Sequence, residues 1–282
     1  MLNQDHNTHL AAQDNRLALY VASWDGYSDL WPGFFHLLSK HWSDCPFKRY
    51  LGVNKLSFER GDLNLVRAEI NSPWSTRVKG HLKQIGEKYV LMLLDDWYIK
   101  SKVDTASILE CIEILERFDG HMMRLVPDPP PNYALASCPK VGLMALGVLN
   151  RTNTHATIWR KETLENILHD DEDLWRFEIN GAVRSNQYSG GMFCVWRQLL
   201  AYDGAVDRGK WVRSVYKKYK TSPGNFDFSK RPIKSTAETF QWRMENIVSP
   251  LCRCAISHRT RQMIKSKLIS NGVSGKLFGD RA

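Results

Sequence analysis

The sequence has few cysteines and no spacing that joins them into a site. Six cysteines are spread over 282 residues, with no Cys-x-x-Cys pair and no matching pair of histidines. Neither a zinc site nor a disulfide framework is therefore indicated, and we expect free or buried thiols. No stretch approaches the roughly 18 apolar residues that span a bilayer. The first residues also lack the charged and apolar regions of a signal peptide, so we expect a cytoplasmic protein.

Internal repeats, low-complexity tracts and a Walker A loop are absent as well. A hydrophobic content of 43% and a charged content of 24% are ordinary for a globular protein. A chain of this length can bury one large core, or a core with an appendage. Composition alone therefore indicates a globular protein and does not indicate its function.

Charge is distributed unevenly along the chain. The net charge is +9, but residues 1–207 carry 22 Lys and Arg against 26 Asp and Glu, a net charge of −4. Residues 208–282 carry 17 against 4, a net charge of +13. Such a segment attracts nucleic acid, anionic lipid or a phosphorylated substrate through long-range electrostatics. The alternative is a solvated basic surface without a dedicated partner.

Apolar runs and helical periodicities alternate through the first half of the chain. We expect strands at 17–22, 47–53, 89–94 and 122–126, and helices at 30–41, 75–85 and 104–115. Pro32 lies in the first turn of the first helix, and Ser75 and Asp104 are the expected N-caps of the other two. This alternation predicts an α/β fold with a mostly parallel central sheet flanked by helices.

The second half continues the pattern after a proline-rich loop at 128–132. We expect a strand at 155–159, a helix at 161–168, a solvated acidic turn at 170–173 and a strand at 192–196. Ser235 and Glu238 have the spacing of a capping box ahead of a further helix. The expected organisation is a disordered tail over 1–15, one large domain over 16–232 and a basic helical extension over 233–282.

The most informative stretch is the apolar run 89–94, which stops at two adjacent carboxylates, Asp95 and Asp96. Six consecutive apolar residues are typical of a strand buried on both faces of a sheet. Ligand sites in such sheets gather at the carboxyl ends of the strands. Paired carboxylates there suit a divalent cation that carries a phosphorylated ligand. The alternative is that both acids face solvent where the strand ends.

Three further groups are candidates for chemistry. Trp24 and Asp25 follow the first strand and could stack on and hydrogen-bond a nucleoside base. Glu178 lies next to aromatic residues, which can raise the pKa of a carboxylate toward the value that a general base needs. Arg184, close behind, could contact a phosphate or orient this acid. Lys210 follows a glycine and suits a departing diphosphate. Each group has a structural alternative: a Trp that covers the sheet, a surface Glu, or an ordinary basic turn.

Taken together, these motifs resemble GT-A type glycosyltransferases, in particular bacterial enzymes of O-antigen and capsule gene clusters. The resemblance covers about 17–211 and is carried by the order and spacing of 24–31, 74–75, 89–96, 158–162, 175–178 and 209–211. It implies a Rossmann-like GT-A sheet whose first strand meets a nucleotide. It also implies an acidic motif that holds Mn²⁺ or Mg²⁺ on a diphosphate, and a later carboxylate that deprotonates the acceptor.

Carried over by residue, the resemblance implies that Trp24 and Asp25 lie near the base, that Asp95 and Asp96 lie at the metal and that Glu178 is the catalytic base. Arg184, Lys210 and Asp95 are the expected contacts of the nucleotide sugar. The sequence departs from the usual Asp-x-Asp motif, since its two acids adjoin. Coordination by a single carboxylate, or no tight metal site, is therefore an open alternative. Aromatic surfaces for sugar rings are expected from Trp97, Tyr98 and Trp175.

The resulting hypothesis is an inverting transfer of a sugar from a nucleotide-diphosphate donor to a glycan or lipid-linked acceptor, in surface-polysaccharide biosynthesis. A retaining enzyme, which could carry much the same residues, is the open alternative. The basic amphipathic segment 250–270 would then rest on the anionic inner leaflet as a peripheral membrane anchor. Two alternatives are a nucleotidyltransferase and a nucleic-acid-binding protein. No RNA-recognition, zinc-finger or K-homology signature accompanies the basic tail, which disfavours nucleic acid as a partner.

Overall fold

The computed structural model describes residues 14–240, 242 and 244. The expected disorder of the N-terminal tail, the amphipathic segment 250–270 and most of the basic extension lie outside the described residues. The chain forms two compact units. The first unit contains Met1–Gly204 and Pro223–Asp227, and the second unit contains Ala205–Ser222 and Phe228–Ala282.

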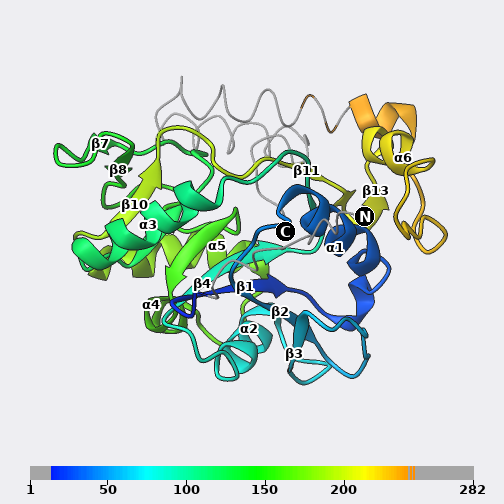
Figure 1. Ribbon diagram of the computed structural model, residues 1–282, viewed down its shortest axis with the longest axis horizontal. Coiled ribbons are helices and arrows are strands. Elements are labelled where there is room, and N and C mark those ends of the chain that lie inside the picture. Colours follow the sequence, from blue (N-terminus) through cyan, green and yellow to red (C-terminus); the bar gives the residue numbers. More distant parts are fainter. Residues whose placement is uncertain (1–13, 241, 243, 245–282) are drawn as a thin grey trace, which may run out of the picture. The chain divides into compact units, whose positions relative to one another are not determined.

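A nine-stranded mixed sheet forms the centre of the first unit, in the order β3-β2-β1-β4-β9-β6-β10-β8-β7 (Figure 1). Seven of these strands run in one direction, and β8 and β9 run against them. The fold class expected from the sequence is therefore confirmed. The strands are β1 Leu17–Ala22, β2 Lys48–Val53, β3 Leu63–Arg67, β4 Tyr89–Leu94, β6 Met122–Arg124, β7 Tyr133–Ala134, β8 Val141–Leu143, β9 Thr157–Arg160 and β10 Met192–Val195.

The apolar run that ends at the paired acids is β4, at the middle of this sheet. Every residue of β4 is buried, because helices cover both faces of the sheet. Its neighbours are β1, which is parallel, and β9, which is antiparallel. The sequence predicted the extent of β1 and β4 residue for residue. The antiparallel neighbour was not foreseen, since a run buried on both faces has the same appearance beside either kind of partner.

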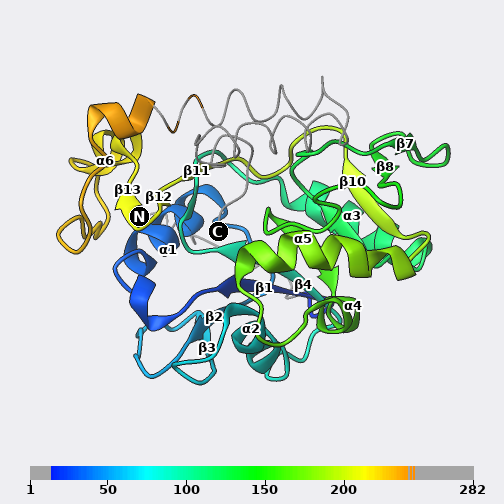
Figure 2. The same cartoon turned by 180° about the vertical axis from the view of Figure 1, so that it is seen from behind.

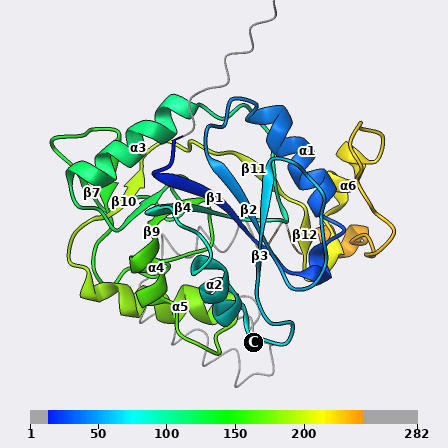
Figure 3. The same cartoon turned by 60° about the horizontal axis from the view of Figure 1, so that its bottom comes forward.

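Helices cover the sheet on both sides. Figures 2 and 3 show α2, α4 and α5 on one face and α1 and α3 on the other. Alternate residues of β1 and β4, such as Tyr20 and Met92, pack with Leu82, Leu164 and Phe177 of the first group of helices. The helices of the first unit are α1 Trp31–His41, α2 Trp74–Leu82, α3 Thr105–Arg117, α4 Lys161–Ile167 and α5 Leu174–Arg184.

The helix starts follow local chemistry, with one correction. Asp104 caps α3 as expected, and its carboxylate accepts a hydrogen bond from the Ala106 amide. The expectation that Ser75 caps α2 is wrong, because the N-cap is Pro73. The Ser75 hydroxyl instead accepts a hydrogen bond from the amide of Glu172, 97 residues further along the chain. A tertiary partner, not the local turn, thus determines what this serine does.

Helix α5 was not foreseen as a helix, although its residues were singled out as a motif. Asp173, the last residue of an acidic run expected to be a solvated turn, is its N-cap and accepts a hydrogen bond from the Arg176 amide at 2.7 Å. The short strands β3, β7 and β8 were missed too. None of the described helices has the length and apolar run needed to cross a membrane.

The second unit begins with a hairpin of β12 Val206–Asp207 and β13 Lys210–Trp211. Arg208 and Gly209 form its turn, both with positive φ (51° and 74°), as the two-residue type I′ turn requires. The glycine of this basic motif is thus explained by the turn. Helix α6, Arg213–Tyr219, follows. The predicted capping box is confirmed, since Ser235 and Glu238 exchange amide-to-side-chain hydrogen bonds.

Gly52→Ala should destabilise the protein by about 2 kcal/mol. A Cβ atom on Gly52 of β2 would lie 2.5 Å from the ring of His81 on α2. That ring cannot retreat easily, because it is buried and its Nδ1 is 2.8 Å from the Tyr20 hydroxyl. Urea unfolding of this variant beside Gly86→Ala, where a Cβ meets open space, tests the prediction. Equal stability of the two variants would contradict it.

Candidate functional site

The paired acids lie in the turn between β4 and β5, Trp97–Ile99. Asp95 is 4% exposed and Asp96 is half-buried, so neither points into bulk solvent. The Ser23 hydroxyl, at the end of β1, donates a hydrogen bond to Asp95, and the Trp31 indole donates to Ser23 at 2.7 Å. This relay holds Asp95 against the end of the neighbouring strand.

The chain before β9 passes beside this turn. Met92 pairs with Thr157 in antiparallel register, so residues preceding β9 lie alongside residues following β4. They form a polar run, Arg151 to His155, whose first four side chains are almost fully buried. A buried polar run this long requires internal hydrogen-bond partners. These partners come from α5, from the loop after β6 and from β11 (Tyr202–Gly204).

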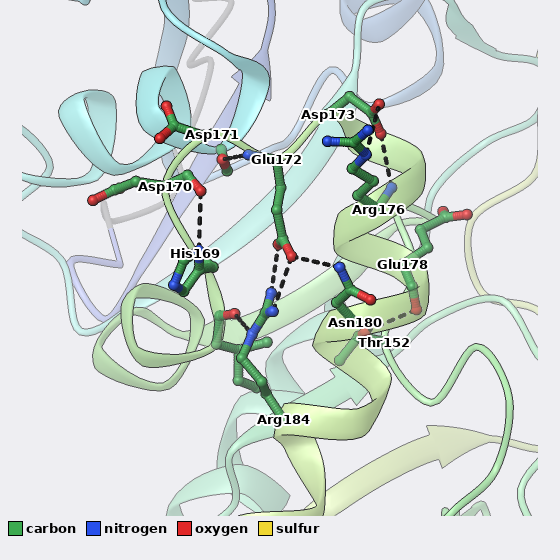
Figure 4. Close-up of polar contacts among 12 residues, drawn as sticks. Thr152, His169, Asp170, Asp171, Glu172, Asp173, Arg176, Glu178, Asn180 and Arg184 are labelled. Atoms are coloured by element: carbon green, nitrogen blue, oxygen red, sulfur yellow. Dashed lines mark hydrogen bonds and ion pairs between the residues drawn. The ribbon is translucent and has the colours of Figure 1, made fainter. Parts of the chain in front are cut away.

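Thr154 of this polar run holds Glu178. Its amide and its hydroxyl both donate hydrogen bonds to Glu178 Oε1, at 2.8 and 2.7 Å. Figure 4 shows that the Glu178 side chain leaves α5 on a different side from Asn180 and Arg184. Two donors on one oxygen orient the carboxylate, and they place it at the start of the strand next to β4.

Trp97, which directly follows the paired acids, packs against two other rings. The Trp97 ring centroid lies 3.9 Å from that of Tyr202 and 4.6 Å from that of His155. The Tyr202 hydroxyl is 2.9 Å from His155 Nδ1. Burial and the negative charges of Asp128 and Asp96 raise the pKa of Tyr202, so its hydroxyl stays protonated at neutral pH. Tyr98 is fully buried against Phe226, so the expectation that it offers a surface to a sugar is wrong.

Arg124, the last residue of β6, organises the loops behind this site. Its buried guanidinium donates to the carbonyl oxygens of Asn150 and Arg151 at 2.7 and 2.8 Å, and to those of Asp128 and Pro129 at longer range. Burial lowers the pKa of Arg124 to about 10, so it stays charged at neutral pH. It therefore anchors both the proline-rich loop and the polar run.

Asp25 organises the loop after β2. Its carboxylate accepts hydrogen bonds from three consecutive backbone amides, those of Asn54, Lys55 and Leu56, at 2.8 to 3.0 Å. Burial opposes ionisation, but these bonds outweigh it and lower the pKa of Asp25. Trp24 beside it is partly exposed, with the Arg77 guanidinium 5.3 Å from its ring centroid. Of the two, only Trp24 offers a large solvent-accessible face.

Arg184 lies at the other side of α5 and is paired with Glu172 (Figure 4). Its two terminal nitrogens donate to the two carboxylate oxygens at 2.9 and 2.5 Å, and Nε donates to the Ile167 carbonyl. Asn180 donates to the same carboxylate at 2.8 Å. The guanidinium expected at a phosphate is thus bound within the fold.

Lys210 belongs to the second unit, where it also has a carboxylate partner. Its ammonium lies 2.5 Å from Glu238, and this bond lowers the pKa of Glu238 to about 2. Among the residues that the structure describes, no three His, Cys, Asp or Glu side chains are arranged to hold a metal ion.

Sequence reasoning singled out Asp95, Asp96 and Glu178, and the fold brings them to the ends of two adjoining strands. Reasoning from the sequence did not identify the residues that support these three acids, namely Ser23, Arg124, Thr154, His155 and Tyr202. The detectable signal was the run Arg-Thr-Asn-Thr-His directly before the apolar residues of β9. Five polar residues at the edge of a buried strand require an explanation that a surface loop does not provide.

No protein-family model and no curated protein matches the chain. Among solved structures it is similar to S. aureus TarS 1–349 in complex with UDP-GlcNAc, at 13% identity and a TM-score of 0.45, over 66% of this chain and 57% of that one. It is also similar to the glycosyltransferase GlyE of Streptococcus pneumoniae (13%, TM-score 0.33, 55% and 35%) and to LgtC (10%, TM-score 0.37, 78% and 85%). The chain spans little more than half of the TarS structure that it matches. Glycosyltransferases are thus among the solved structures that the fold resembles.

Proposed function

We propose that this protein transfers a sugar from a nucleotide-diphosphate donor to a hydroxyl group of a glycan or lipid-linked acceptor. One observation carries the proposal. Two adjacent carboxylates end the central strand β4, and a third, Glu178, is held by Thr154 at the start of the neighbouring strand β9. Such an arrangement suits a phosphorylated donor at the pair and a proton acceptor beside it.

In this proposal Glu178 is the general base. The acceptor oxygen bonds to the anomeric carbon of the donor while the bond from that carbon to the diphosphate oxygen breaks, and Glu178 takes the hydroxyl proton. The hydrogen bonds from Thr154 keep one carboxylate oxygen in place, which fixes the direction of the other. Attack opposite the leaving diphosphate gives inversion. General base catalysis of this kind contributes about 10²- to 10⁴-fold to the rate.

The paired acids fit a divalent cation that a diphosphate brings with it. Mg²⁺ and Mn²⁺ prefer oxygen ligands and are often held by one or two carboxylates plus substrate phosphates. Asp96 is the proposed ligand, with Asp95 behind it in the relay from Ser23 and Trp31. When bound, the cation supplies positive charge for the departing diphosphate.

The donor base is proposed to stack on Trp24. Its ring is partly exposed, and the loop beside it is ordered by the three amide bonds of Asp25. Arg184 and Lys210 already have carboxylate partners, which argues against direct contacts with the donor. On the acceptor side, Trp175 and Ile179 of α5 flank Glu178 in the sequence and are 43% and 58% exposed. They supply an apolar surface for sugar rings or for a lipid.

The proposal also includes a role in surface-polysaccharide biosynthesis and a peripheral location at the cell membrane.

A nucleotidyltransferase is the main alternative from the same observations, since it would use the same acids and the same donor class. A donor labelled in both halves distinguishes the two activities. The sugar appears on the acceptor after glycosyl transfer, and the nucleoside phosphate appears there after nucleotidyl transfer.

A thermal-shift screen against UDP, GDP and their sugar conjugates, with and without Mn²⁺, tests the proposal. A ligand at about 100 times its dissociation constant stabilises the folded state by about 2.7 kcal/mol, which raises the melting temperature by about 5 to 10 °C. Asp96→Asn should abolish the part of the shift that depends on Mn²⁺. The matched control is Asp171→Asn, in the exposed acidic turn before α5. A flat response of the wild type across the whole panel would refute nucleotide-sugar binding.

A further inference from the structure

The boundary between the two compact units is also a boundary in charge. The first unit carries 22 Lys and Arg against 26 Asp and Glu, a net charge of −4. The second unit carries 17 against 4, a net charge of +13. Its described part, 205–222 with 228–240, already has nine basic residues and two acidic ones. The basic character therefore belongs to a compact unit and not only to the residues near the C-terminus.

This described part has a core of its own. Trp211 is fully buried, and its ring lies 4.6 Å from that of Phe228, which packs at 5.1 Å on Tyr216 of α6. The backbone of Trp211 bridges to Ile233. The second unit thus joins the β12–β13 hairpin, α6 and the following segment into one packed element. Such a core can hold surface charges in a defined arrangement.

Both acidic residues of this described part form ion pairs with lysines of the same unit. Asp207 lies 2.6 Å from the buried ammonium of Lys234, and Glu238 lies 2.5 Å from Lys210. Three lysines, Lys217, Lys218 and Lys220, are exposed at the C-terminal end of α6. Basic residues this close in sequence create a positive potential that extends about 8 to 10 Å into physiological buffer.

Apolar side chains are exposed in the same unit. Phe240 is 66% exposed and Met244 is 43% exposed, four positions apart in the sequence. Exposed large apolar side chains in the same unit as exposed lysines are typical of elements that rest at a membrane surface. Three of the aromatic rings on which nucleic acid could stack are engaged within the unit, because Trp211 and Tyr219 are buried and Phe228 packs between neighbours.

We infer that the second unit binds the surface of an anionic phospholipid membrane, with the α6 lysines attracting the headgroups and Phe240 entering the interface. The membrane contact is inferred from the charge, packing and exposure of the second unit and not from the proposed transfer reaction.

Co-sedimentation of the full chain with vesicles tests the inference, without any donor or acceptor present. We expect binding to vesicles with 30% phosphatidylglycerol in phosphatidylcholine, and little binding to phosphatidylcholine alone. Each lysine near such a surface strengthens binding severalfold, so Lys217→Gln with Lys218→Gln and Lys220→Gln should weaken it by about 100-fold. Phe240→Ser should weaken it by about tenfold.

The matched control neutralises three exposed lysines of the first unit, Lys55, Lys83 and Lys102, and should leave vesicle binding within about twofold of the wild type. Three results would overturn the inference. They are equal binding to neutral and anionic vesicles, full binding by the α6 variant, and loss of binding only when Arg253, Arg259 and Arg261 are changed to Gln. Tight binding of an RNA or DNA oligonucleotide in place of vesicles would identify a nucleic-acid partner instead.

Discussion

Glu178→Gln should lower kcat by about 10³-fold while leaving donor binding intact. Glutamine keeps the shape of the side chain, and its amide oxygen can still accept the two hydrogen bonds from Thr154. It cannot accept the proton of the acceptor hydroxyl, so only the chemical step should suffer. Turnover of the nucleotide sugar identified in the thermal-shift screen, measured beside the donor-induced shift of the variant, checks the prediction.

Two comparisons make the result specific to Glu178. Glu113→Gln, the same change at an exposed position of α3, should leave kcat within about twofold. Thr154→Val removes one of the two donors that orient the carboxylate and should lower kcat by about tenfold, whereas Thr154→Ser should restore it. If Glu178→Gln keeps more than about a tenth of the wild-type turnover, the general base is a different residue.

Arg184→Met should lower the free energy of unfolding by about 3 kcal/mol. The Glu172 side chain is only 8% exposed and is bound by both terminal nitrogens of Arg184, so the change leaves a buried carboxylate without its main partner. Urea unfolding at pH 7 measures the loss. Arg176→Met is the matched control, since this exposed arginine lies 3.9 Å from Asp173 and should change stability by less than about 0.5 kcal/mol.

The same pair predicts a dependence on pH. Burial would raise the pKa of Glu172, but the hydrogen bonds from Arg184 and Asn180 outweigh it and lower that pKa. A carboxyl group whose pKa is lower in the folded state than in the unfolded state stabilises the fold above its unfolded value of about 4.3. The difference in stability between the wild type and Glu172→Gln should therefore be present at pH 7 and shrink below about pH 4.

One outcome would contradict the structural role of Arg184 in both predictions. If Arg184→Met is as stable as the wild type but no longer responds to nucleotide sugars, Arg184 contacts the donor after all.

The core strands and most helices could be predicted because their signals are local. The apolar runs of β1 and β4 are typical of strands buried in a sheet. Asp104 marks a helix start through a hydrogen bond within the first turn, and Pro32 marks one through its fixed φ and missing N–H. Helix α5 escaped prediction, and the β12–β13 turn was expected only as the structural alternative to a contact with a diphosphate. Asp173 looked like part of a solvated acidic turn, and only the structure shows that it caps a helix.

The candidate site could be predicted in part for the same reason. Asp95 and Asp96 are recognisable because they end an apolar run, and Glu178 because it follows an aromatic pair. Arg184 looked equally suited to a phosphate, yet it pairs with Glu172, twelve positions earlier in the chain. A charged side chain carries no local mark of whether its partner is a ligand or the protein itself.

The amino-acid sequence by itself determined that this is an α/β protein with paired acids at the end of its central strand and a basic C-terminal quarter. Periodicity, apolar runs and charge counts depend only on neighbouring residues. Only the tertiary structure decided that Ser23 and Trp31 hold Asp95, that Thr154 holds Glu178 and that Arg184 pairs with Glu172. These bonds join residues far apart in the chain, and the polar groups that make them find their partners only when packing removes them from water.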